Sequence, residues 1–95
     1  MNLNDLRIEI DECNKQLFQV IKKRFEITRQ VGRLKAEENL PAYDKERESR
    51  IIKNIREMAK NEKLNPDMME NIFKIIMTEV VKEHQEIKNE YKNDK

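Results

Sequence analysis

The sequence predicts an all-α protein with three helices in a single domain, residues 1–95. Charged residues make up 41% of the chain and hydrophobic residues 37%, so the apolar side chains must recur with a regular period to form a core. One glycine and two prolines are too few for the turns of a sheet, but they suffice to separate long helices. The charges nearly cancel, to a formal net charge of +1, whereas disordered chains favour a high net charge.

The first helix is expected from about residue 3 to about residue 38. Its apolar residues recur at alternating steps of three and four, which indicates one long apolar seam: Leu3, Leu6, Ile10, Cys13, Leu17, Val20, Ile27, Val31 and Leu34. Such a helix is about 52 Å long at 1.5 Å per residue, whereas a compact globule of 95 residues is roughly 32 Å across. The part of the helix that extends beyond such a globule needs a second chain to bury its apolar seam. A two-fold homodimer is the commonest arrangement of this kind.

Two breaks define the other helices. Pro41 ends the first helix, and Asp44 is a natural N-cap for a second helix from about residue 45 to about residue 60. Asn65 and Pro66 fit the N-cap and first position of a third helix, which should end at about residue 90. Apolar residues follow the helical period in both segments, with Ile51, Ile52, Ile55, Met58 and Ala59 in the second and Phe73, Met77, Val80, Ile87 and Tyr91 in the third.

The composition argues against several functional classes. A net charge of +1 provides no broad positive field for nucleic acid. The single cysteine allows neither an internal disulfide nor a cysteine-based zinc site, and it suits a reducing compartment. The first residues are charged almost from the start, so we expect no signal peptide and no membrane span. A cytoplasmic protein without metal, membrane or nucleic-acid partners is therefore expected.

Polar residues occupy positions where the helical pattern calls for apolar ones. Arg24 interrupts the first seam, and Arg24, Thr28, Val31 and Lys35 lie on one stripe of that helix. Glu48 begins the apolar face of the second helix, and His84 interrupts the seam of the third. These groups could meet at a ligand site inside the bundle. In the alternative interpretation Arg24 and Glu48 form a structural ion pair, and the chain is a helical interaction module without a ligand.

Three stretches of sequence resemble the all-helical (AroQ-class) chorismate mutases: LRIEIDECNKQLFQVIKKR, VGRLKAEENLPAYDKERE, and the IFKII run before EHQ. The match runs without gaps from Leu6 through Gln85. Its most specific part is the middle, with Val31-Gly32, Lys35, Pro41, Asp44 and Arg47-Glu48. The resemblance implies an intertwined homodimer of three-helix chains in which the first helix crosses between two active sites. It also implies conversion of chorismate to prephenate in the shikimate route to phenylalanine and tyrosine, without a cofactor.

The resemblance implies a role for each matching cation on the first helix. Arg24 would bind one substrate carboxylate within its own subunit. Arg7 would reach the other carboxylate from the partner subunit. Lys35 would donate to the ether oxygen, where negative charge develops.

The start of the second helix would hold the ring hydroxyl of the substrate. Glu48 would do so through its side chain, and the region of Asp44 partly through backbone. Arg47 would order this helix start and the carboxylate-binding network. Val31 would pack on the substrate.

The third helix departs from the family pattern. At the family's second ether-oxygen donor, usually a glutamine, the ungapped register places His84, with Gln85 one residue on. A serine common four residues earlier is replaced by Val80. His84 can donate as a neutral imidazole or as an imidazolium, which would make the reaction sensitive to pH. Since some relatives split isochorismate to salicylate and pyruvate, such a lyase is an alternative activity.

Overall fold

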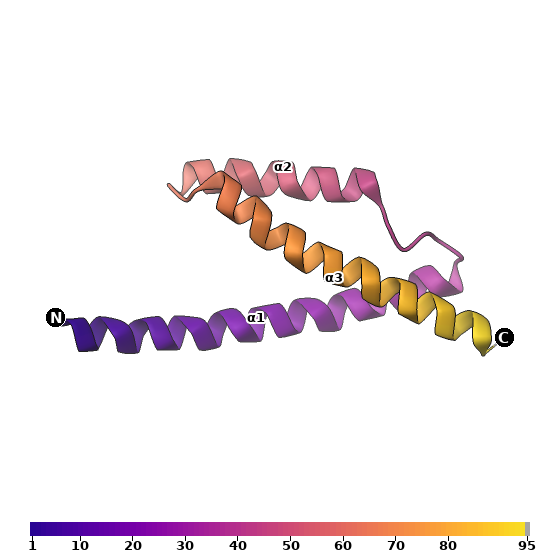
Figure 1. The fold of residues 1–95 in the computed structure, drawn as a ribbon, viewed down its shortest axis with the longest axis horizontal. Coiled ribbons are helices and arrows are strands. Elements are labelled where there is room, and N and C mark those ends of the chain that lie inside the picture. Colours follow the sequence, from indigo (N-terminus) through magenta and orange to yellow (C-terminus); the bar gives the residue numbers. More distant parts are fainter. Residues whose placement is uncertain (95) are drawn as a thin grey trace.

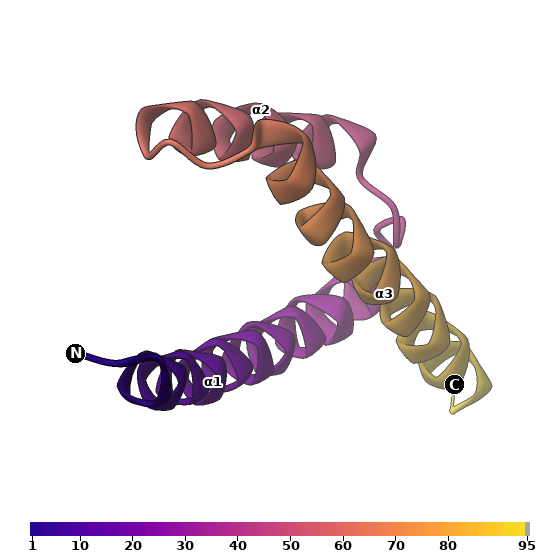
Figure 2. The same cartoon turned by 60° about the vertical axis from the view of Figure 1, so that its left-hand side comes forward.

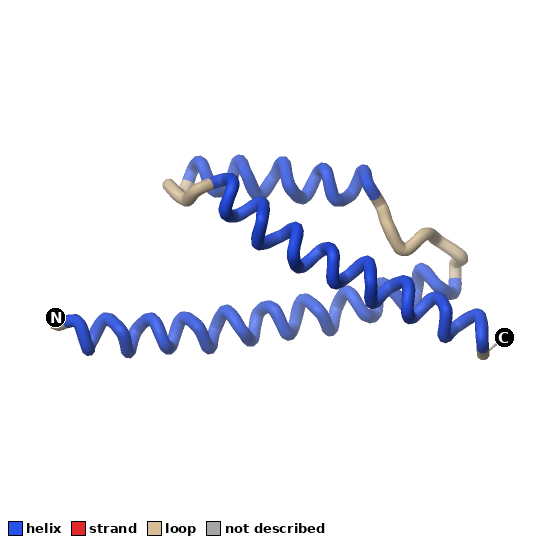
Figure 3. Tube along the Cα trace, viewed as in Figure 1, coloured by secondary structure: helices blue, strands red, loops and turns tan. Residues whose placement is uncertain are grey.

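The computed structural model describes residues 1–94 as three α-helices, with no strand in this range. They are α1 (Leu3–Glu37), α2 (Lys45–Asn61) and α3 (Pro66–Asn93), joined by two short connections (Figures 1 and 3). The predicted all-α class with three helices is confirmed. The third helix runs to Asn93, beyond the expected end at about residue 90.

Side-chain caps fix where each helix begins. The Asn2 side chain accepts the backbone N–H of Asp5 at 2.9 Å, and Asp5 in turn accepts the N–H of Asn2, which is a capping box. Asp44 caps α2 by accepting the N–H of Arg47 at 3.0 Å. Asn65 caps α3 in the same way, and Pro66 is its first residue, where the missing N–H costs nothing.

The third helix connects the other two. It packs against both α1 and α2, whereas α1 and α2 do not pack on each other anywhere in the described chain. Figure 2 shows α3 running from the end of α2 across to the C-terminal half of α1, with the N-terminal half of α1 extending away from both. The site described below therefore lies between two helices that only α3 holds in place.

Very little of the single chain is buried. Ala36, Ala59 and Met77 are the buried hydrophobic residues within 1–94, together with Gly32 and the imidazole of His84. The extents of the molecule are 60 × 26 × 14 Å and its radius of gyration is 17.1 Å, compared with roughly 12 Å for a compact domain of this length. The fold is thus an open frame and not a closed bundle.

The N-terminal half of α1 is not packed against any other helix in residues 1–94. Every residue from 1 to 20 is exposed, including most of the apolar seam: Leu3, Leu6, Ile10, Leu17 and Val20. An apolar stripe of this length is unusual on the surface of a monomer. No helix within residues 1–94 is both long enough and apolar enough to cross a lipid bilayer.

Candidate active site

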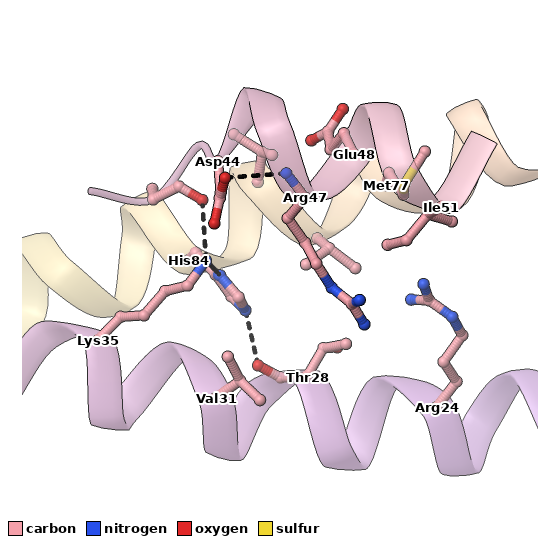
Figure 4. A pocket seen from close by; sticks show the side chains of 13 residues that line it. Arg24, Thr28, Val31, Lys35, Asp44, Arg47, Glu48, Ile51, Met77 and His84 are labelled. Atoms are coloured by element: carbon pink, nitrogen blue, oxygen red, sulfur yellow. Dashed lines mark hydrogen bonds between the residues drawn. The ribbon is translucent and has the colours of Figure 1, made fainter. Parts of the chain in front are cut away.

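All three helices line one pocket, whose volume including the open mouth is about 600 Å³ (Figure 4). The lining residues are Arg24, Thr28, Val31 and Lys35 from α1, Ala42 and Asp44 from the connection, Arg47, Glu48 and Ile51 from α2, and Met77, Val80, Val81 and His84 from α3. The pocket brings together all the predicted site residues except Arg7 and Gln85.

Two arginines face each other across this pocket, and within residues 1–94 neither forms a salt bridge. In Figure 4 the guanidinium groups of Arg24 and Arg47 point into the same space. The Nη1 atom of Arg24 is buried and has no hydrogen-bond partner among residues 1–94. Burial, and secondly the charge of Arg47, lowers the pKa of Arg24. A buried guanidinium nitrogen without a partner is costly, so this arrangement favours binding of an anionic ligand.

The predicted structural ion pair is not formed. Arg24 and Glu48 both line the pocket, but no salt bridge joins them within the described chain. Glu48 is half-buried, and its carboxylate forms no salt bridge within residues 1–94. The interpretation of the two residues as a mutually satisfied pair is therefore wrong for this chain.

Lys35 and His84 form a short chain of polar contacts that ends on the backbone of α1. His84 Nε2 lies 2.6 Å from the carbonyl oxygen of Thr28. His84 Nδ1 lies 3.5 Å from Lys35 Nζ, which also donates to the carbonyl oxygen of Ala42 at 3.4 Å. A carbonyl oxygen only accepts, so Nε2 carries the hydrogen. A neutral ring then presents the lone pair of Nδ1 to Lys35.

Burial governs the charge of this histidine. The His84 residue is 4% exposed. Its pKa is lowered mainly by burial, with Lys35 acting in the same direction, while the contact with Thr28 and the charge of Glu83 oppose the shift. The neutral form is therefore favoured near neutral pH.

The imidazole fits in this place because α1 has its only glycine there. A Cβ atom on Gly32 would lie 2.7 Å from His84 Cδ2 and 2.9 Å from Ile87 Cδ1. Both distances are shorter than normal van der Waals contact. Gly32 therefore lets the ring of His84 lie directly against the backbone of α1.

The N-cap of α2 presents the acidic and basic residues of its first turn. Because Asp44 accepts the backbone N–H of Arg47, the first turn begins at a fixed residue. Glu48 follows directly, and both side chains line the pocket. Residues three and four apart share one face of a helix, which is why Asp44, Arg47 and Glu48 gather at one place.

Two predicted site residues lie outside the pocket. Arg7 is exposed on the N-terminal half of α1, roughly 25 Å along the helix from Arg24 at 1.5 Å per residue. Gln85 is exposed and donates to Asn89 Oδ1 at 3.0 Å. Consecutive helical residues point about 100° apart, so placing His84 in the pocket turns Gln85 away from it. Of the two neighbouring candidates for the second donor position, His84 lines the pocket and Gln85 does not.

Several residues that complete the pocket could not be picked out from the sequence. Ile51, Met77 and Val81 form apolar walls, and the carbonyl of Ala42 holds Lys35. Ile51 and Met77 were recognised only as helical apolar positions, a pattern that does not separate a pocket wall from a core residue. In the part of the chain that the structure describes, no group of three or more His, Cys, Asp or Glu residues could hold a metal ion.

Residues 6–85 match the family described as chorismate mutase type II. The chain is 36% identical over 77 residues to the T-protein of Haemophilus influenzae, a match that covers 81% of this chain and 20% of that protein. It is 29% identical over 94 residues to the bifunctional chorismate mutase/prephenate dehydratase of Buchnera aphidicola, covering 96% of this chain and 24% of that protein. It is 28% identical over 75 residues to the chorismate mutase of Methanocaldococcus jannaschii, covering 79% of this chain and 76% of that protein.

Proposed function

The chain belongs to the chorismate mutase type II family, and we propose that it converts chorismate to prephenate in the biosynthesis of phenylalanine and tyrosine. It spans only 20% and 24% of the first two relatives described above. The observation that carries the proposal is the buried Arg24 Nη1, which has no partner among the residues that the structure describes and faces a second arginine. A dicarboxylate substrate would supply the missing acceptors.

The proposed reaction is a Claisen rearrangement within one molecule. One C–O bond breaks while one C–C bond forms, and neither a nucleophile nor an obligatory proton transfer takes part. The site must therefore hold the substrate in its compact reactive conformer and stabilise negative charge on the ether oxygen. A pocket with several cations and apolar walls is suited to both tasks.

We assign carboxylate binding to the arginines. Arg24 would pair with one carboxylate in its own subunit, and Arg47 would support the same network from α2. The planar guanidinium pairs with a carboxylate through two parallel hydrogen bonds. This pairing would satisfy Arg24 Nη1, which has no partner in the described part of the chain.

Lys35 is the proposed donor to the ether oxygen. Its side chain is half-buried, and an ammonium group in a site with little water stabilises developing charge more strongly than one in bulk solvent. Glu48 and the region of Asp44 would hold the ring hydroxyl. Val31 and Val80 would pack on the apolar parts of the substrate.

The functional unit proposed here is a homodimer with shared sites. The uncovered N-terminal half of α1 supports this, because a second copy would bury its apolar stripe. Arg7 lies on that half and is too far from Arg24 to reach the pocket of its own subunit, so it would serve the site of the partner. The proposed location is the cytoplasm, where a single cysteine without a disulfide partner stays reduced.

The first experiment follows chorismate loss and prephenate formation with the purified protein, with Lys35→Ala measured in parallel. We expect turnover by the wild-type chain and a large loss in the variant. A folded protein that leaves chorismate unchanged would refute the proposal. Isochorismate, tested in the same assay, separates a mutase from a lyase by the release of pyruvate.

Mixed dimers test the shared site. Arg7→Ala and Lys35→Ala chains should each be inactive alone. When the two are mixed, one of the two sites in each heterodimer regains both residues, so activity should return. Failure to recover activity in verified heterodimers would contradict the cross-subunit role of Arg7.

A further inference from the structure

We propose that His84 is a positioning residue whose neutral ring accepts a hydrogen bond from Lys35 through Nδ1 and aims the ammonium group into the pocket. This inference rests on the proposed chorismate rearrangement. It gives His84 a role different from the second ether-oxygen donor that the family resemblance implies. Which of these two roles His84 can play depends on which ring nitrogen carries the hydrogen.

The backbone of α1 fixes the tautomer. Nε2 faces the Thr28 carbonyl oxygen at 2.6 Å, a short distance for a hydrogen bond between nitrogen and oxygen. A neutral imidazole has one N–H, and here it is used by Thr28. No hydrogen remains on Nδ1 for donation to the substrate.

The ring has no room to turn. His84 is 4% exposed, and a Cβ on Gly32 would already clash with Cδ2 of the ring. Reversing the ring would also leave the Thr28 carbonyl facing a carbon atom. The orientation that places Nδ1 toward Lys35 is therefore maintained by packing as well as by the hydrogen bond.

Lys35 uses the contact to direct its charge. An ammonium group has three N–H donors. Two of them have acceptors in the chain, Ala42 O at 3.4 Å and His84 Nδ1 at 3.5 Å, and both contacts are long. The third donor remains for a ligand in the pocket. Without His84, a flexible lysine would be held only by the carbonyl of Ala42.

Protonation of His84 would reverse this effect. The imidazolium has no acceptor, and its positive charge would lie next to the Lys35 ammonium. The other charged groups near the ring belong to every element around it: Arg24 on α1, Asp44 in the connection, Arg47 and Glu48 on α2, and Glu83 on α3. Activity should therefore fall as the pH drops through the lowered pKa of His84. A donor role predicts the opposite, because an imidazolium donates more strongly.

The tautomer can be measured without any substrate. The chain contains one histidine, so ¹⁵N NMR of the imidazole reports His84 alone. We expect hydrogen on Nε2 at neutral pH, and a higher His84 pKa in Lys35→Met, because Lys35 disfavours the charged ring. Hydrogen on Nδ1, or an unchanged pKa in Lys35→Met, would overturn the inference.

Kinetics then test whether the contact matters for turnover. The rate of chorismate loss is measured from about pH 5 to about pH 9, on both sides of an ordinary histidine pKa, for wild type, His84→Ala and His84→Gln. Glu86→Ala, an exposed position on the same helix, serves as the matched control. We expect His84→Ala to lower kcat about 10²-fold with little change in KM, as misplacement of a catalytic group does.

The glutamine variant separates positioning from structural support. Its side-chain oxygen can accept from Lys35 and its amide nitrogen can donate to Thr28. His84→Gln should therefore recover most of the activity and lose the decline at acidic pH. A wild-type rate that rises in acid, or His84→Ala at full kcat, would overturn the positioning role while leaving the proposed function intact. No chorismate turnover by wild type with the expected tautomer would instead refute the proposed function, and the positioning role with it.

Discussion

The contact between Gly32 and His84 makes a sharp prediction about the stability of Gly32→Ala. Alanine is favoured over glycine inside a helix by about 0.8–1.0 kcal/mol. The added Cβ would lie 2.7 Å from His84 Cδ2 and 2.9 Å from Ile87 Cδ1. The end of the isoleucine side chain can move at little cost, but the ring is buried and held on Thr28 O.

Overpacking of this kind typically costs about 1–3 kcal/mol. After subtraction of the helix-propensity gain, we expect Gly32→Ala to destabilise the protein by about 1 kcal/mol. This lowers the Tm by about 4–8 °C for a domain of this size. Thermal unfolding at one fixed protein concentration measures the change, since association would otherwise alter the Tm.

A double-mutant cycle with His84→Ala identifies the cause. Removing the ring removes the main clash, so Gly32→Ala in that background should stabilise by about 1 kcal/mol through helix propensity alone. The sign of the effect should therefore differ between the two backgrounds. If Gly32→Ala stabilises the wild type, or destabilises both backgrounds equally, the ring does not lie against Gly32 as described.

Three further predictions concern other parts of the pocket. Arg24→Met should abolish chorismate turnover yet raise the stability of the ligand-free protein by about 1 kcal/mol. The substitution removes a buried nitrogen that has no partner among the described residues. A lowered Tm of the variant would contradict the expected gain in stability. Asp44→Ala should lower the stability by about 1 kcal/mol, because the N-cap is lost, and should lower activity by disturbing Arg47 and Glu48. Asp44→Asn keeps the cap and serves as the control. Equal unfolding midpoints of the two variants in urea would contradict the role of the cap. The pKa of His84 is lowered in the folded chain. Below the ordinary histidine pKa of about 6.5, the unfolded state therefore binds more protons than the folded state. The free energy of unfolding should fall as the pH drops through the folded pKa. Urea unfolding on both sides of that range should show this acid loss in wild type and a smaller one in His84→Gln.

The helices could be predicted because their ends are marked by local chemistry. Asn65 and Pro66 start α3, and Asp44 starts α2, through caps that depend on neighbouring residues alone. The end of α3 was harder to predict, because its last turns carry few apolar residues. Tyr91 lines a pocket together with Ala36 and Glu37 of α1, so the last turns of α3 lie near the end of a helix that is distant in sequence.

The candidate site could be predicted where its polar groups belong to side chains. Arg24 and His84 were found because each interrupts an apolar seam, and Lys35 because it lies on the same stripe of the first helix as Arg24. The acceptors that orient them are the carbonyl oxygens of Thr28 and Ala42, and every residue type has such a group. The hydrogen on His84 Nε2 could therefore be assigned only once the backbone of α1 was placed beside the ring.

The central position of α3 also has a consequence for synthesis of the chain on the ribosome. Since α1 and α2 do not pack on each other, the residues up to Asn61 emerge without a tertiary partner among themselves. Two isolated helices gain little stability in water before packing begins. Folding of this chain must therefore wait until α3 leaves the exit tunnel, and until then the apolar stripe of α1 is available to chaperones and to neighbouring nascent chains.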